Sequence, residues 1–148
     1  WSRRVGKNKT CFLMPKFRTM IAETPEVATD ELSSPKKYLT PIGSFLRKSS
    51  LDELPQLLSV LKGDMSIVGP RPALYNQHDL NIKRNELGID VLKPGITGWA
   101  QINGRDNISL KKKIDLDYYY LQHQSILFDY QIMLKTIHAM IKSKDIIY

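Results

Sequence analysis

Two adjacent carboxylates, Asp52 and Glu53, are the residues of this sequence whose types and spacing most directly suggest chemistry. They stand in the stretch SSLDELPQLLSVLKGD, residues 49–64, where a leucine-rich segment begins. Carboxylates are favoured at a helix start by unpaired backbone N–H groups and by the positive end of the helix dipole, so the pair is consistent with a simple helix cap. A helix start also suits bound phosphate, and the pair alone leaves both interpretations open.

Three arginines near this pair favour phosphate binding. Arg47 precedes the leucine-rich segment, Arg71 stands between two prolines in GPRP, and Arg105 follows a glycine-rich stretch. Backbone that is rigid or rich in glycine can approach a ligand closely, and a guanidinium group binds two phosphate oxygens at once. Each arginine taken singly is equally consistent with a solvated surface charge. The three together favour a site for a phosphorylated ligand.

The segment that must position the carboxylates is expected to be an amphipathic helix. Four leucines at i, i+3, i+4 and i+7 form one apolar stripe: Leu54, Leu57, Leu58 and Leu61. A start near Asp52 keeps Pro55 in the first turn, where a missing N–H is tolerated. Gly63 is expected to end the helix, because glycine readily adopts the left-handed conformation of a helix C-terminus.

Other segments predict more helix than strand. Residues 42–50, IGSFLRKSS, predict a short helix, and residues 16–20, KFRTM, predict a short strand or extended segment. Residues 23–41 combine prolines with many polar residues, which is typical of a surface loop. The C-terminal segment, residues 118–148, has an apolar side flanked by lysines. That pattern is typical of an interfacial membrane helix and equally of a helix that faces a core.

Composition indicates one globular domain with acidic partners. The 148 residues are 42% hydrophobic, and Lys plus Arg outnumber Asp plus Glu by 22 to 15, which gives a net charge of +7. This charge favours phosphates, nucleic acid or anionic lipid without choosing among them. The sequence contains no nucleic-acid motif and no interleaving of aromatic and basic residues. No apolar run approaches the roughly 18 residues of a membrane span, and a single cysteine excludes a disulfide framework.

Three long motifs, in this order and spacing, resemble one known family: KFRTM, SLDELPQLLSVLKGDMSIVGPRP and KPGITGWAQINGRD. They resemble the bacterial sugar transferases, which are monotopic phosphoglycosyl transferases also called polyprenyl-phosphate hexose-1-phosphate transferases. The resemblance runs from about Arg4 to the C-terminal helix. It implies transfer of a sugar 1-phosphate from a UDP-sugar to polyprenyl phosphate, typically undecaprenyl phosphate, with release of UMP. Such a reaction starts the synthesis of capsule, exopolysaccharide, O-antigen or glycoprotein glycan.

The resemblance also implies roles for individual residues. Asp52 matches the family's nucleophile, which forms an aspartyl-phosphosugar intermediate, and Glu53 matches its ligand for Mg2+. The positions that match phosphate-binding or nearby basic residues of the family are Arg47, Arg71, Arg105 and Lys16. The glycine-rich stretch GITGWAQINGR is expected to shape the wall near the nucleotide or its phosphates. Trp99 within that stretch is consistent with uracil stacking and with packing against the core.

We therefore expect an α+β fold: a helix-rich single catalytic domain over residues 1–148, with a few short strands and interfacial amphipathic helices. Its expected cofactor is Mg2+, and its expected partners are a UDP-sugar, polyprenyl (undecaprenyl) phosphate and the membrane interface, with no nucleic acid. The expected place of action is the cytoplasmic face of a bacterial inner membrane, with a re-entrant membrane helix upstream of this sequence. The competing interpretation is a non-enzymatic basic module that binds anionic membrane or nucleic acid. The sugar, the glycan pathway and the oligomeric state do not follow from the sequence.

Overall fold

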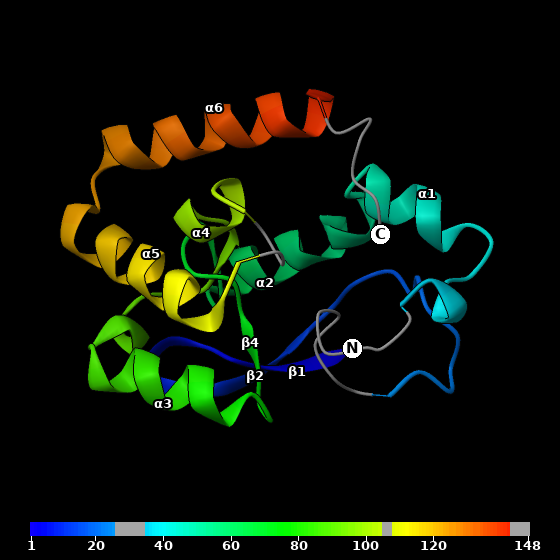
Figure 1. Ribbon diagram of the computed structural model, residues 1–148, viewed down its shortest axis with the longest axis horizontal. Helices are drawn as coiled ribbons and strands as arrows, with labels where there is room; N and C mark the ends of the chain where they lie inside the picture. The colour runs from blue at the N-terminus through cyan, green and yellow to red at the C-terminus, as the bar shows by residue number, and fades with distance from the viewer. Residues whose placement is uncertain (26–34, 105–107, 143–148) are drawn as a thin grey trace.

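A computed structural model describes residues 1–25, 35–104 and 108–142 of the chain (Figure 1). Within these ranges helices dominate, and each strand is only two to four residues long. This composition confirms the expected α+β class with few and short strands. Residues 26–34, which belong to the expected surface loop, lie outside the described part of the chain.

The helical elements follow one another along most of the chain. The α-helices are α1 (Gly43–Lys48), α2 (Leu57–Lys62), α3 (His78–Glu86), α4 (Trp99–Ile102), α5 (Leu110–His123) and α6 (Ile126–Lys142). The 3-10 helices are η1 (Lys7–Lys9), η3 (Pro35–Tyr38), η4 (Leu51–Gln56) and η5 (Ile89–Val91). The helix expected within residues 42–50 is confirmed as α1.

The strands form two small sheets. β1 (Ser2–Val5) pairs antiparallel with β2 (Cys11–Met14) on one side and with β4 (Ala73–Leu74) on the other. β3 (Ser66–Val68) and β5 (Gly95–Thr97) form a parallel pair, and the crossover that such a pair requires contains α3 and η5. Because parallel strands end at the same edge, the segments after β3 and β5 start side by side. Residues 16–19 form no strand, and Met20 makes only an isolated bridge to Leu39.

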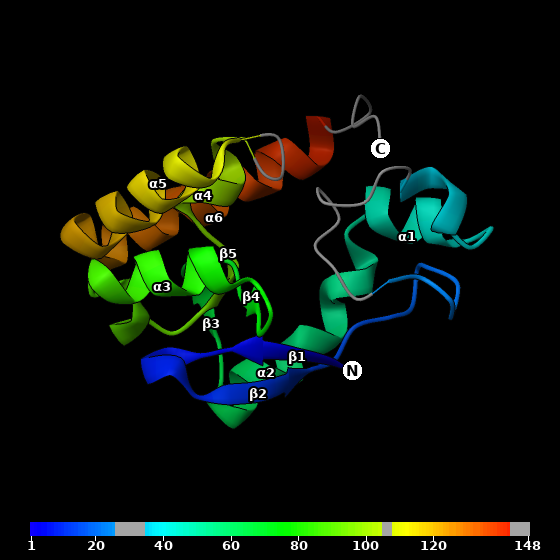
Figure 2. The same cartoon turned by 60° about the horizontal axis from the view of Figure 1, so that its bottom comes forward.

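Two adjoining clusters of buried side chains make up the core. One joins β4, α3, η5 and α5 through four residues: Ala73, Leu80, Ile89 and Ile114. The other joins β3, α5 and α6 through Val68, Tyr120 and Ile132. The hydroxyl of Tyr120 donates to Oδ1 of Asp129 at 2.7 Å, so the polar atom of this buried ring is satisfied where α5 meets α6. Figure 2 shows α3 between the N-terminal hairpin and α5.

The helix that carries the leucine stripe begins later than expected. The α-helical part starts at Leu57, and η4 precedes it with Pro55 inside. Proline has no N–H to donate, so the hydrogen bonds of a regular α-helix cannot continue through this position. Gly63 ends α2 with φ 86°, as its sequence position predicted.

The leucine stripe faces outward. All four of its leucines are exposed, up to 84% for Leu61, whereas the buried side of η4 and α2 carries the polar residues Gln56 and Ser59. In α6 the apolar side divides: Ile132 is fully buried, and six other apolar residues are exposed, namely Ile126, Leu127, Tyr130, Leu134, Ile137 and Met140. The buried Ile132 agrees with a helix that faces a core, and the exposed apolar residues agree with an interfacial membrane helix. No helix among the described residues has the length and hydropathy that crossing a bilayer requires.

Candidate active site

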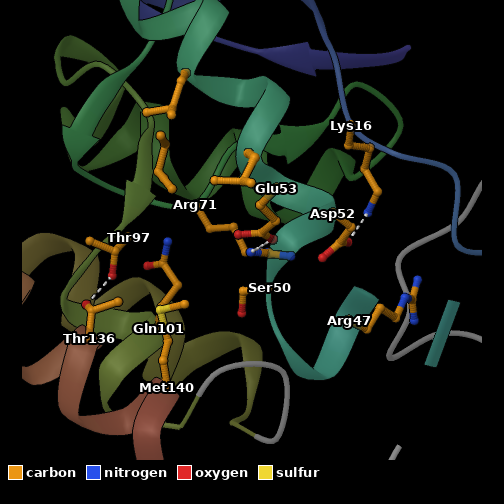
Figure 3. A pocket seen from close by; sticks show the side chains of 13 residues that line it. Lys16, Arg47, Ser50, Asp52, Glu53, Arg71, Thr97, Gln101, Thr136 and Met140 are labelled. Atoms are coloured by element: carbon orange, nitrogen blue, oxygen red, sulfur yellow. Dashed lines mark hydrogen bonds and ion pairs between the residues drawn. The ribbon is translucent and has the colours of Figure 1, made fainter. Parts of the chain in front are cut away.

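A cavity of about 250 Å3 opens between η4, the loop after β3, the segment after β5, and α6 (Figure 3). Its lining combines charged, neutral polar and aliphatic side chains: Lys16, Arg47, Ser50, Asp52, Glu53, Leu54, Leu57, Arg71, Ile96, Thr97, Gln101, Thr136 and Met140. In the view of Figure 3, Lys16, Asp52 and Arg47 lie on one side, and Thr97, Thr136 and Gln101 lie on the other, with Glu53 and Arg71 between. The cavity thus has a charged end and a neutral end.

A local break in helical hydrogen bonding positions Asp52. Because Pro55 has no N–H, the carbonyl of Asp52 is not taken up by the next 3-10 turn. That carbonyl instead accepts a hydrogen bond from the N–H of Phe17 at 3.0 Å. The contact holds the segment that carries Lys16 against the start of η4. Ser50, which precedes η4, adopts φ 55°, a left-handed conformation that costs energy in a residue other than glycine and is typical of functional sites.

The carboxylate of Asp52 is buried beside a cation. Nζ of Lys16 lies 3.6 Å from Oδ2 of Asp52. Burial raises the pKa of Asp52, and the neighbouring Lys16 charge opposes that rise. Burial likewise lowers the pKa of Lys16. A helix start favours an ionised carboxylate, whereas burial of Asp52 shifts its pKa in the opposite direction.

Glu53 and Arg71 form the middle of the cavity, with Nη1 of Arg71 3.2 Å from Oε1 of Glu53. The GPRP loop that carries Arg71 is held through three successive carbonyls. The carbonyl of Pro70 accepts from the N–H of Gly95 at 2.9 Å, and that of Pro72 accepts from Nη1 of Arg4 at 3.0 Å. The third bond, to the carbonyl of Arg71 itself, comes from another arginine.

That arginine is Arg84 of α3, whose Nη1 donates to the carbonyl of Arg71 at 2.9 Å. Its Nε and Nη2 donate to Oδ2 of Asp117 on α5 at 3.1 and 2.6 Å. Both residues are buried, so α3 and α5 together hold the backbone of the GPRP loop. Sequence reasoning missed this pair. The sequence did contain one signal for it. Asp117 is three residues from Ile114 and three from Tyr120, so its carboxylate lies on the apolar side of α5.

The structure brings five of the six predicted site residues to one cavity. Arg47 lines it from α1 and donates through Nε to Oγ1 of Thr19 at 3.0 Å. Lys16, Asp52, Glu53 and Arg71 are the other four. Arg105 lies outside the described residues.

The expectation of Mg2+ depends on Glu53, which lines the cavity next to Asp52. No group of three or more potential metal ligands occurs among the described His, Cys, Asp and Glu residues. Mg2+ is commonly bound by one or two carboxylates, with the remaining ligands supplied by substrate phosphates and water. Two adjacent carboxylates at the edge of a cavity with cationic side chains fit that mode of binding.

The neutral end was only partly foreseen. The glycine-rich stretch was expected to form a wall, and Ile96, Thr97 and Gln101 do line the cavity, while Thr136 and Met140 from α6 were not anticipated. Trp99 is not among the lining residues. Its ring stacks on Tyr119 of α5 at 5.9 Å and packs against Phe128 and Lys135 of α6, as the core-packing interpretation predicted.

A family model described as bacterial sugar transferase matches residues 1–143. The chain is 44% identical over 143 residues to the uncharacterized sugar transferase EpsL of Bacillus subtilis, covering 97% of this chain and 69% of that protein. It is 41% identical over 142 residues to a UDP-glucose:undecaprenyl-phosphate glucose-1-phosphate transferase of Xanthomonas campestris, covering 90% of this chain and 29% of that protein. It is 34% identical over 158 residues to an undecaprenyl-phosphate galactose phosphotransferase of Salmonella typhimurium, covering 95% and 32%.

Proposed function

The chain belongs to the bacterial sugar transferase family, and from that premise we propose that it transfers a sugar 1-phosphate from a UDP-sugar to polyprenyl phosphate, with release of UMP. Undecaprenyl phosphate is the proposed acceptor, because the names of two relatives include this lipid phosphate. One observation carries the proposal: the buried carboxylate of Asp52 shares a cavity with Lys16, Arg47 and Arg71. A nucleophile surrounded by cations suits attack on a diphosphate.

The proposed reaction has two steps at one phosphorus atom. A carboxylate oxygen of Asp52 attacks the phosphorus that carries the sugar, and the bond from that phosphorus to the bridging oxygen breaks. The electron pair leaves with UMP, and an aspartyl-phosphosugar remains on the protein. An oxygen of the polyprenyl phosphate then attacks the same phosphorus, which restores the carboxylate and forms the lipid-linked diphosphate sugar.

Charge neutralisation is the main task of the surrounding residues. A carboxylate approaches a diphosphate against electrostatic repulsion, and Lys16, Arg47 and Arg71 reduce that repulsion in a partly buried site. The planar fork of Arg71 is suited to two phosphate oxygens. Glu53 is the proposed ligand of Mg2+, which when bound supplies further positive charge to the diphosphate.

The acceptor's tail requires an apolar surface beside the cavity. Leu54 and Leu57 line the cavity and belong to the exposed leucine stripe, and the exposed apolar face of α6 includes Met140, which also lines the cavity. Exposed leucines above buried polar residues are the reverse of an ordinary surface helix, and such patches mark interaction sites. We propose that both faces contact the membrane interface, at the cytoplasmic side of a bacterial inner membrane.

A direct assay tests the function. Full-length protein in vesicles with undecaprenyl phosphate and Mg2+ is incubated with a panel of UDP-sugars, and UMP release is measured. The proposal predicts release over many turnovers with at least one UDP-sugar. Without the lipid acceptor, release should stop at about one UMP per protein, because only the first step can occur. A basic module that only binds anionic membrane or nucleic acid would release no UMP from any UDP-sugar.

The intermediate has its own test. Protein incubated with a UDP-sugar labelled in the sugar, without acceptor, is denatured in acid and assayed for bound label. Wild-type protein should retain the label, and Asp52→Asn should not. Asp64→Asn, which alters an exposed carboxylate after α2, is the matched control. Retention of label by Asp52→Asn would refute the assignment of the nucleophile.

A further inference from the structure

The side-chain amide of Gln101 is a polar group that the fold leaves unused. Both of its amide atoms, Nε2 and Oε1, are buried, and neither has a hydrogen-bond partner among the residues that the structure describes. Gln101 lies on α4 and lines the neutral end of the cavity (Figure 3). A buried amide without partners costs free energy of folding. Retaining such a group at a cavity wall is explained if a ligand supplies the missing partners.

The neighbouring threonines have no proton to give this amide. The hydroxyl of Thr136 donates its single proton to the carbonyl of Ile132 at 2.8 Å. In the contact of 2.7 Å between the two threonine hydroxyls, Thr97 must therefore be the donor. Both protons are thus committed within the protein. Oε1 of Gln101 therefore takes its donor from whatever occupies the cavity, either water or a ligand.

The backbone fixes Gln101 relative to the GPRP loop. A Cβ atom built on Gly98, at the start of α4, would lie 2.0 Å from the carbonyl oxygen of Gly69, so only glycine permits this approach. The same Cβ would lie 2.7 Å from Oε1 of Gln101. Gly69 in turn donates its N–H to the carbonyl of Thr97 at 2.9 Å. Because backbone contacts set this spacing, the amide holds a defined position beside Arg71.

We infer that Gln101 binds the imide edge of the uracil base of the nucleotide donor. The inference rests on the proposed function. In phosphoryl transfer the attacking and leaving oxygens are roughly in line, so the UMP leaving group points away from Asp52. Figure 3 shows Gln101 on the side of Glu53 and Arg71 that is away from Asp52. The nucleoside therefore extends toward the neutral end of the cavity.

The chemistry of the neutral end matches a pyrimidine imide. The N3–H of uracil donates to Oε1 of Gln101, and an adjacent uracil carbonyl accepts from Nε2, which satisfies both amide atoms at once. Aliphatic side chains of Leu57, Ile96 and Met140 line the cavity and offer contacts to the flat faces of the ring. A site built to hydrogen-bond a polar group rejects an analogue that lacks that group.

Calorimetry with two nucleotides tests the inference. The full-length protein carrying Asp52→Asn, so that no sugar phosphate is transferred, is titrated with UDP and with the UDP analogue methylated at uracil N3. The parent should bind UDP about ten-fold more tightly than the analogue, which is a difference of about 1.4 kcal/mol. Adding Gln101→Met should weaken UDP binding about ten-fold and leave less than about a two-fold difference between the nucleotides. Adding Gln131→Met, the same change at an exposed position of α6, should alter neither value.

Thermal unfolding without nucleotide separates binding from a structural role. Gln101→Met removes an amide that has no partner, so the Tm should stay the same or rise. A lower Tm together with weaker binding of both nucleotides would overturn the inference, and so would unchanged UDP binding. The proposed function is judged by a separate result. If wild-type protein releases no UMP from any UDP-sugar, the proposed function is wrong. If wild-type protein releases UMP but Gln101→Met binds UDP as tightly as its parent, only the role of Gln101 is wrong.

Discussion

Nζ of Lys16 lies 3.6 Å from Oδ2 of Asp52. The two residues have 35 others between them in the sequence, and no helix or sheet contains both. The link is the hydrogen bond from the N–H of Phe17 to the carbonyl of Asp52, which Pro55 leaves available. The two side chains are electrostatically coupled. Burial raises the pKa of the Asp52 carboxyl, and the charge of Lys16 lowers it.

The pH dependence of the first step should therefore shift when Lys16 is changed. If Asp52 must be ionised to attack, kcat/KM for the UDP-sugar falls as pH drops through the pKa of Asp52 in the free enzyme. Lys16→Met removes a charge that lowers this pKa, so the midpoint of the acidic limb should move to higher pH. Lys83→Met, at an exposed lysine that pairs with Glu86, should leave the midpoint unchanged. Identical acidic limbs in wild type and Lys16→Met would contradict the coupling.

Asp52→Asn should abolish turnover and stabilise the fold. The amide is a far weaker nucleophile, so activity should fall at least about 1,000-fold. Because burial raises the pKa of Asp52, the carboxyl's contribution to stability is present at low pH and is lost as pH rises through its folded-state pKa. The neutral amide avoids that loss, so the Tm at pH 7 should exceed that of wild type. The difference should shrink at pH below 3.8, the ordinary pKa of an aspartate side chain. Near wild-type turnover by Asp52→Asn would show that Asp52 is not the nucleophile.

Glu53→Gln should raise the Mg2+ concentration that gives half-maximal activity by about ten-fold or more, because a neutral amide oxygen attracts a hard cation less than a carboxylate does. The measurement is UMP release across a Mg2+ titration. Glu86→Gln, at an exposed position of α3, is the control. If a chelator leaves the activity unchanged, the proposal that the reaction requires Mg2+ is wrong.

Arg71→Lys should reduce kcat/KM for the UDP-sugar about a hundred-fold, although the charge is kept. An ammonium group lacks the planar fork that grips two phosphate oxygens, and it would also lose the present geometry toward Glu53. Arg18→Lys, the same change at an exposed arginine, should have little effect. Unchanged kinetics in Arg71→Lys would assign Arg71 a structural role.

The sequence predicted α1, the apolar stripe of α2 and the stop at Gly63 because these depend on local periodicity and glycine conformation. Its long motifs also contain four of the five charged residues that line the cavity, all but Arg47. It predicted a few short strands but not their positions, since β4 has only two residues and is defined by pairing with a segment far away in the chain. Periodicity likewise locates an apolar stripe without telling whether protein covers it, which is why the exposure of Leu61 was unexpected. Arg84 and Gln101 were missed because their significance depends on partners that only the fold brings near.

The buried pair of Arg84 and Asp117 provides the last prediction, which concerns the position of Arg71. Asp117→Asn leaves the guanidinium of Arg84 buried without its counter-ion, and breaking such a pair costs about 3–5 kcal/mol of unfolding free energy. We expect a large drop in stability measured by denaturant unfolding. That drop alone would not distinguish a role in folding from a role in positioning the GPRP loop.

A double variant makes the distinction. Arg84→Met combined with Asp117→Leu replaces the ion pair with apolar side chains of similar size, which often restores stability. It cannot restore the hydrogen bond from Arg84 to the carbonyl of Arg71, because methionine has no donor. If Arg84 positions Arg71, the double variant should unfold near the wild-type denaturant midpoint and still show a lower kcat/KM for the UDP-sugar. Recovery of both stability and activity would mean that Pro70 and Pro72, with the hydrogen bonds to their own carbonyls, hold Arg71 in place without Arg84.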